Sequence, residues 1–179
     1  LGDGATSEGE FWEALNATCT KQLPVLFLVE DNGYAISVPV EVQTAGGDIS
    51  RLVRSFPGLH VATVDGTDFL SSLKAMREAA AYVRARKGPA FVHAHVIRPY
   101  SHSLSDDEKL YKTPAEREAE AKRDPLKRLS EFLRANQLVT EQELRQFSPE
   151  LAKSVEDILE IYDRPLEVVD EDDPGSAAR

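Results

Sequence analysis

The sequence predicts an α/β fold, in which a parallel sheet with crossover helices is followed by a helical C-terminal region. Three short apolar runs, at 25–29, 59–64 and 90–97, have the length and the branched side chains of strands that are covered on both faces. A helical pattern at 69–86 separates the second run from the third. Strand, helix and strand in this order indicate parallel strands joined by right-handed crossovers.

The first element is a helix, expected at about 8–20. Ser7 is its expected N-cap, with Glu10 three residues later, and Phe11 and Leu15 recur at helical spacing. This helix lies between the opening glycines, at 2–4, and the first apolar run.

The segments between the later elements read as a loop and a capped helix. Residues 33–50 are interrupted by glycines and lack a sustained period, so we expect a long loop. After the second strand, Thr67 or Asp68 should cap the helix at 69–86, and the Lys-Gly-Pro sequence at 87–89 should end it.

The C-terminal part is helical and acidic. Pro114 and Pro125 each open an expected helix, and Thr140 reads as the cap of a third. We therefore predict two domains, an α/β domain at 1–112 and a helical extension with an acidic tail at 113–179.

The net charge and the cysteine content narrow the classes of protein. The 179 residues include 21 Lys and Arg against 31 Asp and Glu, a formal net charge of −10 that disfavours nucleic acid and anionic membranes as partners. No apolar run approaches the ~18 residues of a membrane span, so we expect a soluble chain. Cys19 is the single cysteine, which excludes an intrachain disulfide and fits a reducing compartment. We favour the bacterial cytoplasm, with the mitochondrial matrix as the open alternative.

Polar residues with ligand chemistry follow the ends of two expected strands. Asp3 lies between two glycines just before the first helix, and Asn32 follows the first apolar run. Ligands of parallel α/β sheets bind at the carboxyl ends of the strands, and neighbouring strands lie ~5 Å apart. A carboxylate and an amide oxygen there could share one Mg²⁺, while the bare glycine backbone and the helix N-terminus could accept an anion. The pattern predicts a site for a diphosphate with magnesium.

Two histidines share one face of the third expected strand. His93 and His95 lie two residues apart, so their side chains point the same way and could offer two nitrogens to a metal. No third cysteine, histidine or carboxylate stands at matching spacing, and the sequence therefore favours no metal site there.

The start of the chain predicts a missing upstream segment. The sequence begins at Leu1 without an initiator methionine, and its single methionine is Met76. Because Gly2 would stand at the end of a strand whose beginning is absent, we expect the chain to be N-terminally truncated.

The strand-end motifs resemble a known family. Residues 2–9, Gly-Asp-Gly-Ala-Thr-Ser-Glu-Gly, and residues 30–37, Glu-Asp-Asn-Gly-Tyr-Ala-Ile-Ser, together resemble the thiamine-diphosphate motif of 2-oxo acid dehydrogenase alpha subunits. The second segment is most similar to the branched-chain type. Residues 98–107 look like the family's active-site loop with its His-Ser-x-Ser-Asp core. The resemblance covers roughly residues 1–135 and implies the thiamine diphosphate-binding fold.

The resemblance assigns cofactor contacts residue by residue. It implies that the side chains of Asp3 and Asn32, with the backbone carbonyl of Tyr34, hold the magnesium ion. Gly4 and Ala5 would meet the diphosphate of thiamine diphosphate. The family has further cofactor contacts upstream of these residues, so we expect the isolated chain to hold part of the cofactor site and to be inactive alone.

The loop residues match the family less completely. His102 matches the active-site histidine, which binds near the cofactor and is expected to assist reductive acylation of a lipoyl group. Ser103 and Ser105 match positions that mitochondrial relatives phosphorylate, but the sequence cannot predict that modification here. Asp31 departs from the family, which commonly has asparagine at that place.

The function implied is that of the decarboxylating dehydrogenase component of a 2-oxo acid dehydrogenase complex. It would perform thiamine diphosphate-dependent oxidative decarboxylation of a branched-chain 2-oxo acid, 2-oxoisovalerate, with acyl transfer to a lipoyl group. The implied partners, in a heterotetramer, are a beta subunit or fused beta domain and the lipoyl domain of the dihydrolipoyl acyltransferase core. Two alternatives stay open: a pyruvate or acetoin dehydrogenase alpha subunit, and a truncated, noncatalytic interaction module.

Overall fold

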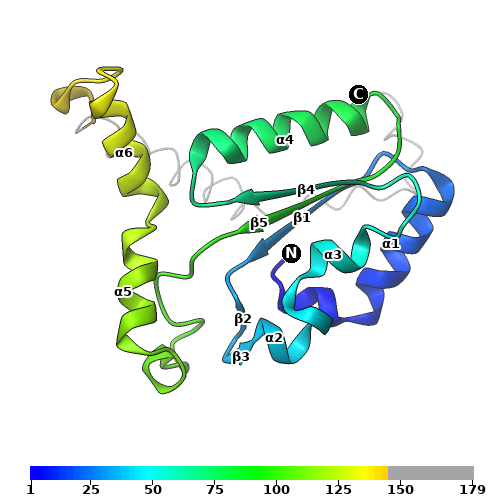
Figure 1. The fold of residues 1–179 in the computed structure, drawn as a ribbon, viewed down its shortest axis with the longest axis horizontal. Helices are drawn as coiled ribbons and strands as arrows, with labels where there is room; N and C mark the ends of the chain where they lie inside the picture. The colour runs from blue at the N-terminus through cyan, green and yellow to red at the C-terminus, as the bar shows by residue number, and fades with distance from the viewer. Residues whose placement is uncertain (145–179) are drawn as a thin grey trace, which may run out of the picture. The chain divides into compact units, whose positions relative to one another are not determined.

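The computed structural model describes residues 1–144, and its elements follow the predicted order (Figure 1). The central parallel sheet contains, in spatial order, β1 (Leu26–Asp31), β5 (Ala90–His95) and β4 (His60–Asp65). Gly2 adds a parallel bridge to Glu30 of β1. The predicted α/β class with a parallel sheet and crossover helices is confirmed.

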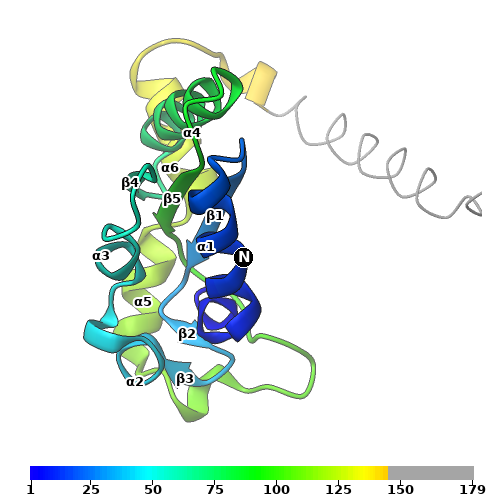
Figure 2. The ribbon, with the colours of Figure 1, turned by 90° about the vertical axis from the view of Figure 1, so that its right-hand side faces the viewer.

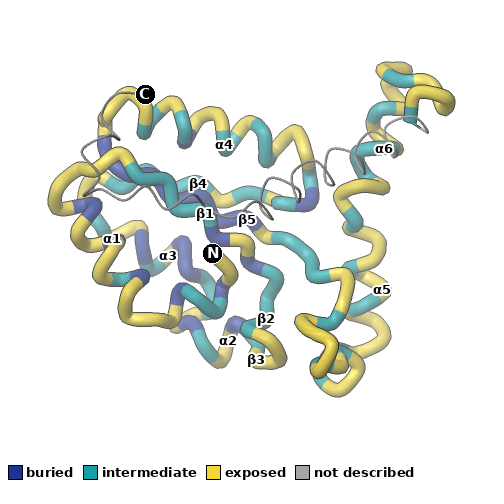
Figure 3. Tube along the Cα trace, turned by 180° about the vertical axis from the view of Figure 1, so that it is seen from behind, coloured by how far each residue is buried: buried dark blue, intermediate teal, exposed yellow. Residues whose placement is uncertain are grey.

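Helices cover both faces of this sheet (Figures 1 and 2). One face carries α1 (Gly9–Lys21) and α3 (Ile49–Val53), and the other carries α4 (Phe69–Arg84). Val29 and Phe91 pack in the first layer, and Val92 packs in the second. The strands read as unbroken apolar runs because both of their faces are covered, and Figure 3 shows the buried positions gathered there.

The predicted cap of α1 is wrong. Glu8 occupies the N-cap position, and no side chain caps the helix there. The cause is a short 3₁₀ helix, η1 (Gly4–Ser7), which takes Ser7 into its own turn. The Ser7 hydroxyl donates instead to the Gln43 carbonyl, at 3.3 Å.

Helix α4 begins as predicted and ends slightly earlier. The Asp68 side chain caps it by accepting a hydrogen bond of 2.7 Å from the Ser71 N–H. Thr67 does not cap the helix; its hydroxyl donates to Asp65 at 2.6 Å. The helix ends at Arg84 because Arg86 adopts a left-handed backbone conformation, with φ 54°.

The predicted loop at 33–50 contains several short elements. They are β2 (Tyr34–Ala35), β3 (Val38–Pro39), α2 (Val40–Gln43) and the 3₁₀ helix η2 (Ala45–Gly47), followed by the start of α3. The Val40 N–H donates to the Gly33 carbonyl at 2.9 Å, and the Asp48 carboxylate caps α3. Elements this short are shorter than the windows in which a hydrophobic period can be read, which explains why the sequence showed only a loop.

After β5 the described part of the chain includes η3 (Glu108–Leu110), α5 (Pro114–Lys122) and α6 (Pro125–Ala135). Thr113 and Glu116 form a complete capping box at the start of α5. Thr140 forms the same reciprocal bonds with Glu143, which confirms the predicted capped start at that position. The rest of that helix and the acidic end of the chain lie outside the described residues.

Residues 1–132 form one compact unit, and the described residues 133–144 belong to another. The predicted domain division after residue 112 stays a prediction. Within residues 1–144, no helix is both long and apolar enough to cross a bilayer.

Candidate functional site

The N-terminal segment brings Asp3 to the carboxyl end of the sheet. The Glu30 N–H donates to the Leu1 carbonyl at 2.8 Å, so the segment runs alongside β1. Asp3 follows, with only 2% of its surface exposed. Its carboxylate accepts a hydrogen bond of 2.6 Å from the Gln43 side-chain amide. A buried carboxylate requires such partners, and Gln43 is one that the sequence did not indicate.

The end of β1 forms two successive turns. The Gly33 N–H donates to Asp31 Oδ1 at 2.8 Å, and the Tyr34 N–H donates to Asn32 Oδ1 at 3.2 Å. These turns place the Asn32 backbone within hydrogen-bonding reach of the Asp3 carboxylate. The structure therefore brings Asp3 and Asn32 together, as strand spacing led us to expect; their binding of a metal stays a prediction.

The electrostatics of this corner favour a cation. Burial raises the pKa of Asp3, and the neighbouring charge of Asp31 raises it further, against hydrogen bonds from Asp3 and Asn32 backbone groups and from Gln43. Two carboxylates thus lie close together in a poorly hydrated place, where a divalent cation would stabilise both in their ionised form. Carboxylate, amide and carbonyl oxygens are the hard ligands that Mg²⁺ takes. The residues present therefore fit a magnesium ion.

Gly4 lies directly against the loop that follows β1. A Cβ atom on Gly4 would stand 2.7 Å from the Ala35 Cβ and 3.3 Å from the Ala35 Cα, a distance that side chains cannot share. Glycine is therefore required for this close approach. Ala5 sits in η1, where its N–H donates to the Gly2 carbonyl at 3.1 Å. The contact of Gly4 and Ala5 with a diphosphate stays a prediction.

Tyr34 connects the same loop to α5. Its hydroxyl donates to Glu116 Oε1 at 3.1 Å. Its ring centroid lies 5.3 Å from the buried Lys112 Nζ and 5.5 Å from the Tyr111 ring. Tyr34 lies two residues after Asn32, and its N–H donates to Asn32 Oδ1, so the carbonyl predicted as a metal ligand belongs to the residue that closes the Asn32 turn.

His102 lies on an exposed loop that follows β5. Its backbone N–H donates to Asp106 Oδ2 at 2.8 Å, and the Tyr111 hydroxyl donates to the same oxygen at 2.6 Å. Arg98 in turn donates to the Tyr111 hydroxyl at 2.5 Å. Among the described residues, no hydrogen bond or ion pair joins the His102 side chain to Asp3. The structure fixes the backbone at His102 and leaves its imidazole in solvent.

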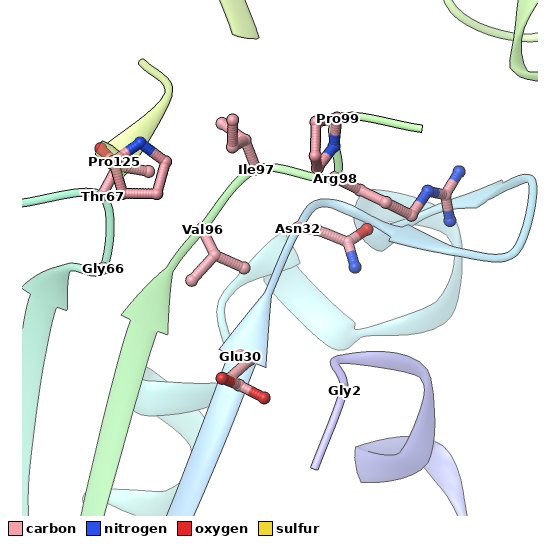
Figure 4. Close-up of a pocket in the computed structure, with 10 residues that line it drawn as sticks. All are labelled: Gly2, Glu30, Asn32, Gly66, Thr67, Val96, Ile97, Arg98, Pro99 and Pro125. Atoms are coloured by element: carbon pink, nitrogen blue, oxygen red, sulfur yellow. The ribbon is translucent and has the colours of Figure 1, made fainter. Parts of the chain in front are cut away.

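A cavity of about 440 Å³ opens at the carboxyl ends of the three strands (Figure 4). Asn32 and Glu30 line it from β1 and the turn after it, Thr67 lines it from the β4 end, and Arg98 lines it from the segment after β5. Asn32 is the predicted site residue that this cavity contains. Ligands of parallel sheets bind at this edge, and the pocket is where the sequence led us to look.

A buried histidine–aspartate hydrogen bond that the sequence did not predict lies beneath this corner. His93 Nε2 lies 2.8 Å from Asp31 Oδ2, and both side chains are buried. Burial opposes ionisation of Asp31, but the hydrogen bonds from His93 and from the Gly33 N–H outweigh it, so the pKa of Asp31 lies below its ordinary value. Burial, and then the charge of His93, lower the pKa of His95. No sequence motif predicts that Asp31 and His93 are in contact, because β1 and β5 become neighbours only when the sheet forms.

The fold and the site together define the class. A parallel α/β sheet with an acid and an amide at adjoining strand ends is typical of proteins that bind ligands at that edge. Residues 1–167 match the family described as "Dehydrogenase E1 component". The chain belongs to this family.

Individual relatives agree with the family match. The chain is similar to the pyruvate dehydrogenase E1 component subunit alpha of Mycoplasma genitalium, with 32% identity over 171 residues that cover 94% of this chain and 47% of the relative. It is also similar to the somatic, mitochondrial form from Homo sapiens, with 36% identity over 157 residues, 87% of this chain and 40% of the relative. The chain thus spans less than half the length of these curated relatives.

The relatives bear on the type of dehydrogenase. They are named for pyruvate, so they support the pyruvate alternative better than the branched-chain type.

Proposed function

We propose that the chain supplies magnesium- and thiamine diphosphate-binding residues to the E1 component of a 2-oxo acid dehydrogenase complex. The observation that carries the proposal is the meeting of Asp3 and Asn32 at two adjoining strand ends, in a chain that belongs to the E1 family. The Asp3 carboxylate is buried, and the nearby charge of Asp31 disfavours its ionisation further. A cation bound here would offset both effects, which supports the proposal.

Each residue has a distinct task in this proposal. The side chains of Asp3 and Asn32 and the carbonyl of Tyr34 would hold the magnesium ion. Gly4, which lets this turn pack directly against Ala35, and Ala5 would meet the diphosphate through their backbone. Thiamine diphosphate, when bound, supplies an electron sink for decarboxylation of the 2-oxo acid. The chain's own residues orient the cofactor and keep its diphosphate away from water.

His102 would act as the proton-handling group of the active-site loop. Its exposed imidazole is free to meet a substrate or a lipoyl group brought by a partner, and its backbone is held by Asp106. The partners proposed are a beta subunit or beta domain, which would complete the cofactor site, and the lipoyl domain of the acyltransferase core. Both are proposals from family membership.

The names of the relatives favour pyruvate as the substrate of this chain's complex. The relatives from Mycoplasma genitalium, Mycoplasma pneumoniae and Homo sapiens are named as the alpha subunit of the pyruvate dehydrogenase E1 component. The second candidate is 2-oxoisovalerate, favoured by the Asn-Gly-Tyr-Ala-Ile-Ser sequence at 32–37. Steady-state kcat/KM values of the assembled complex for both acids decide between them. A higher value for 2-oxoisovalerate would overturn the pyruvate assignment while leaving the E1 function in place.

The cofactor proposal is tested by calorimetric titration of thiamine diphosphate, with Mg²⁺, into the full-length protein assembled with its beta partner. The variant Asp3→Asn keeps the shape of the side chain and an acceptor for Gln43, but removes the charge. We expect its affinity for the cofactor to fall at least about tenfold. Glu13→Gln, an exposed charge removal on α1, is the matched control and should bind normally. Equal affinity in Asp3→Asn and the unmodified protein would contradict the proposal.

A further inference from the structure

Three metal-binding side chains converge below the cofactor corner. Ligand atoms of Asp31, His93 and His95 all lie within 4.8 Å of one another. Asp31 pairs in register with His95 across the β1–β5 ladder, so both side chains and that of His93, two residues away, lie on one face of the sheet. The third ligand that the sequence lacked is supplied by the neighbouring strand.

The distances suit a small divalent ion. Asp31 Oδ2 lies 2.8 Å from His93 Nε2 and 3.8 Å from His95 Nδ1, and the two ring centroids are 4.2 Å apart. Ligands at ~2.1 Å from a tetrahedral zinc ion are about 3.4 Å apart. The two distances between ligand atoms, 2.8 and 3.8 Å, lie on either side of that value. All three ligand atoms lie within 4.8 Å of one another, so the side chains must draw closer together to bind one ion.

The proton count at His93 also favours a cation. His93 is fully buried between two carboxylates, with Nε2 against Asp31 and Nδ1 3.6 Å from Asp48 Oδ1. A neutral imidazole carries one N–H, so it can donate to only one of the two. A proton on Nε2 donates to Asp31 and leaves the Nδ1 lone pair, which has no hydrogen-bond partner, facing the Asp48 carboxylate. A proton on Nδ1 leaves the Nε2 lone pair facing the Asp31 carboxylate instead. A cation between them makes both groups ligands, and Asp48 becomes the outer carboxylate that orients a metal-bound histidine.

The cluster reaches solvent through His95. His95 is 46% exposed, whereas His93 and Asp31 are buried. An ion could enter at the His95 side and keep a water molecule as its fourth ligand there. Two imidazoles and one carboxylate select Zn²⁺ and related ions over Mg²⁺, which prefers oxygen ligands alone.

We infer that Asp31, His93 and His95 form a binding site for a divalent transition-metal ion of the zinc class, distinct from the magnesium site proposed above. The competing arrangement is metal-free: Nε2 of His93 is protonated and donates to Asp31, and Nδ1 either carries no proton or carries a second one directed to Asp48. The two arrangements differ in metal affinity and in the protonation of His93.

The test uses Co²⁺ as a spectroscopic substitute for Zn²⁺, titrated into the full-length protein in the presence of excess Mg²⁺. We expect one Co²⁺ per chain, with visible ligand-field absorption, displaced by Zn²⁺. Because substitution of the buried His93 disturbs the fold, the primary variant is the half-exposed His95→Gln, which should weaken Co²⁺ binding at least about tenfold. His60→Gln, on β4, is the matched control and should bind normally. Asp3→Asn should retain most of its Co²⁺ affinity, because Asp3 supplies none of the three ligands, although its charge acts on the neighbouring Asp31.

The outcomes separate this inference from the proposed function. Absence of saturable Co²⁺ and Zn²⁺ binding, or equal binding in His95→Gln, overturns the inference. Binding that is lost in Asp3→Asn but kept in His95→Gln means that Co²⁺ has occupied the magnesium corner, which also overturns it while supporting the proposed function. Nitrogen chemical shifts that show Nε2 of His93 protonated, in protein supplied with Zn²⁺, identify the metal-free arrangement.

Discussion

Asp3 and Asn32 take their positions from backbone pairing in the sheet, whereas His102 takes its position from side chains of its own loop. Asp3 is buried beside β1, held by the pairing of Leu1 with Glu30. His102 is exposed, and its backbone is held through Asp106. The first region is positioned by the same hydrogen bonds that form the fold. The second can change its conformation without disturbing the sheet.

This difference suits the two tasks proposed for the regions. A site that holds a metal and a diphosphate needs fixed oxygen atoms, and sheet ends provide them. A loop that meets a partner-borne group needs to open and close, and loops on rigid scaffolds commonly do this. The following predictions test whether the two regions respond as differently as their construction suggests.

The largest effect is expected from His93→Leu, measured by urea unfolding in the presence of a chelator. The substitution leaves Asp31 as a buried, uncompensated carboxylate, which typically costs about 3–5 kcal/mol. The double variant His93→Leu with Asp31→Asn removes the stranded charge and should recover a substantial part of the loss. A loss below about 1 kcal/mol in the single variant would show that the pair does not stabilise the sheet end.

Gly4→Ala should have the next largest effect. Its new Cβ would lie 2.7 Å from the Ala35 Cβ, so the loop after β1 must move, at a cost of about 1–3 kcal/mol. Affinity for thiamine diphosphate should fall with it. Gly2→Ala, whose Cβ would meet nothing within 4 Å, is the matched control. The idea fails if both variants unfold at the same urea concentration.

Tyr111→Phe should act on the loop alone. It removes the hydroxyl that donates to Asp106, which also holds the His102 backbone. We expect amide hydrogen exchange at His102 to quicken a few-fold, while the amides of β1 and β5 exchange as before. Equal acceleration in the strands would mean that loop and sheet open as one unit.

The smallest expected effect is a decrease in the free energy of unfolding at alkaline pH. Burial, and then the hydrogen bond to Asp106, raise the pKa of Tyr111 from 10.0 to about 12. Because the folded state binds this proton more tightly, the resulting stabilisation is complete below pH 10 and is lost as the pH rises through 12. Unfolding followed across this interval should show the decline, and the decline should be weaker in Tyr111→Phe. An identical profile in the variant would assign the dependence to another group.

The sheet and the meeting of Asp3 with Asn32 could be predicted from the sequence, because apolar runs and strand-end residues are local signals. The Asp31–His93 pair could not, since it depends on β5 lying next to β1 rather than next to β4 alone. Gln43 was missed for a related reason. It lies in α2, too short to show a period, and reaches Asp3 only through the folded turn.

The burial of Lys112 offers a chemical reporter of the loop. Its ammonium group is fully shielded, lies 2.7 Å from Glu120, and faces the Tyr34 ring, whereas Lys109 is exposed three residues earlier. An amine-reactive acylating reagent should therefore modify Lys109 rapidly and spare Lys112 while α5 stays docked on the Tyr34 turn. The ratio of the two labels, read by mass spectrometry, would report how often that turn is uncovered and how a bound cofactor or partner changes it.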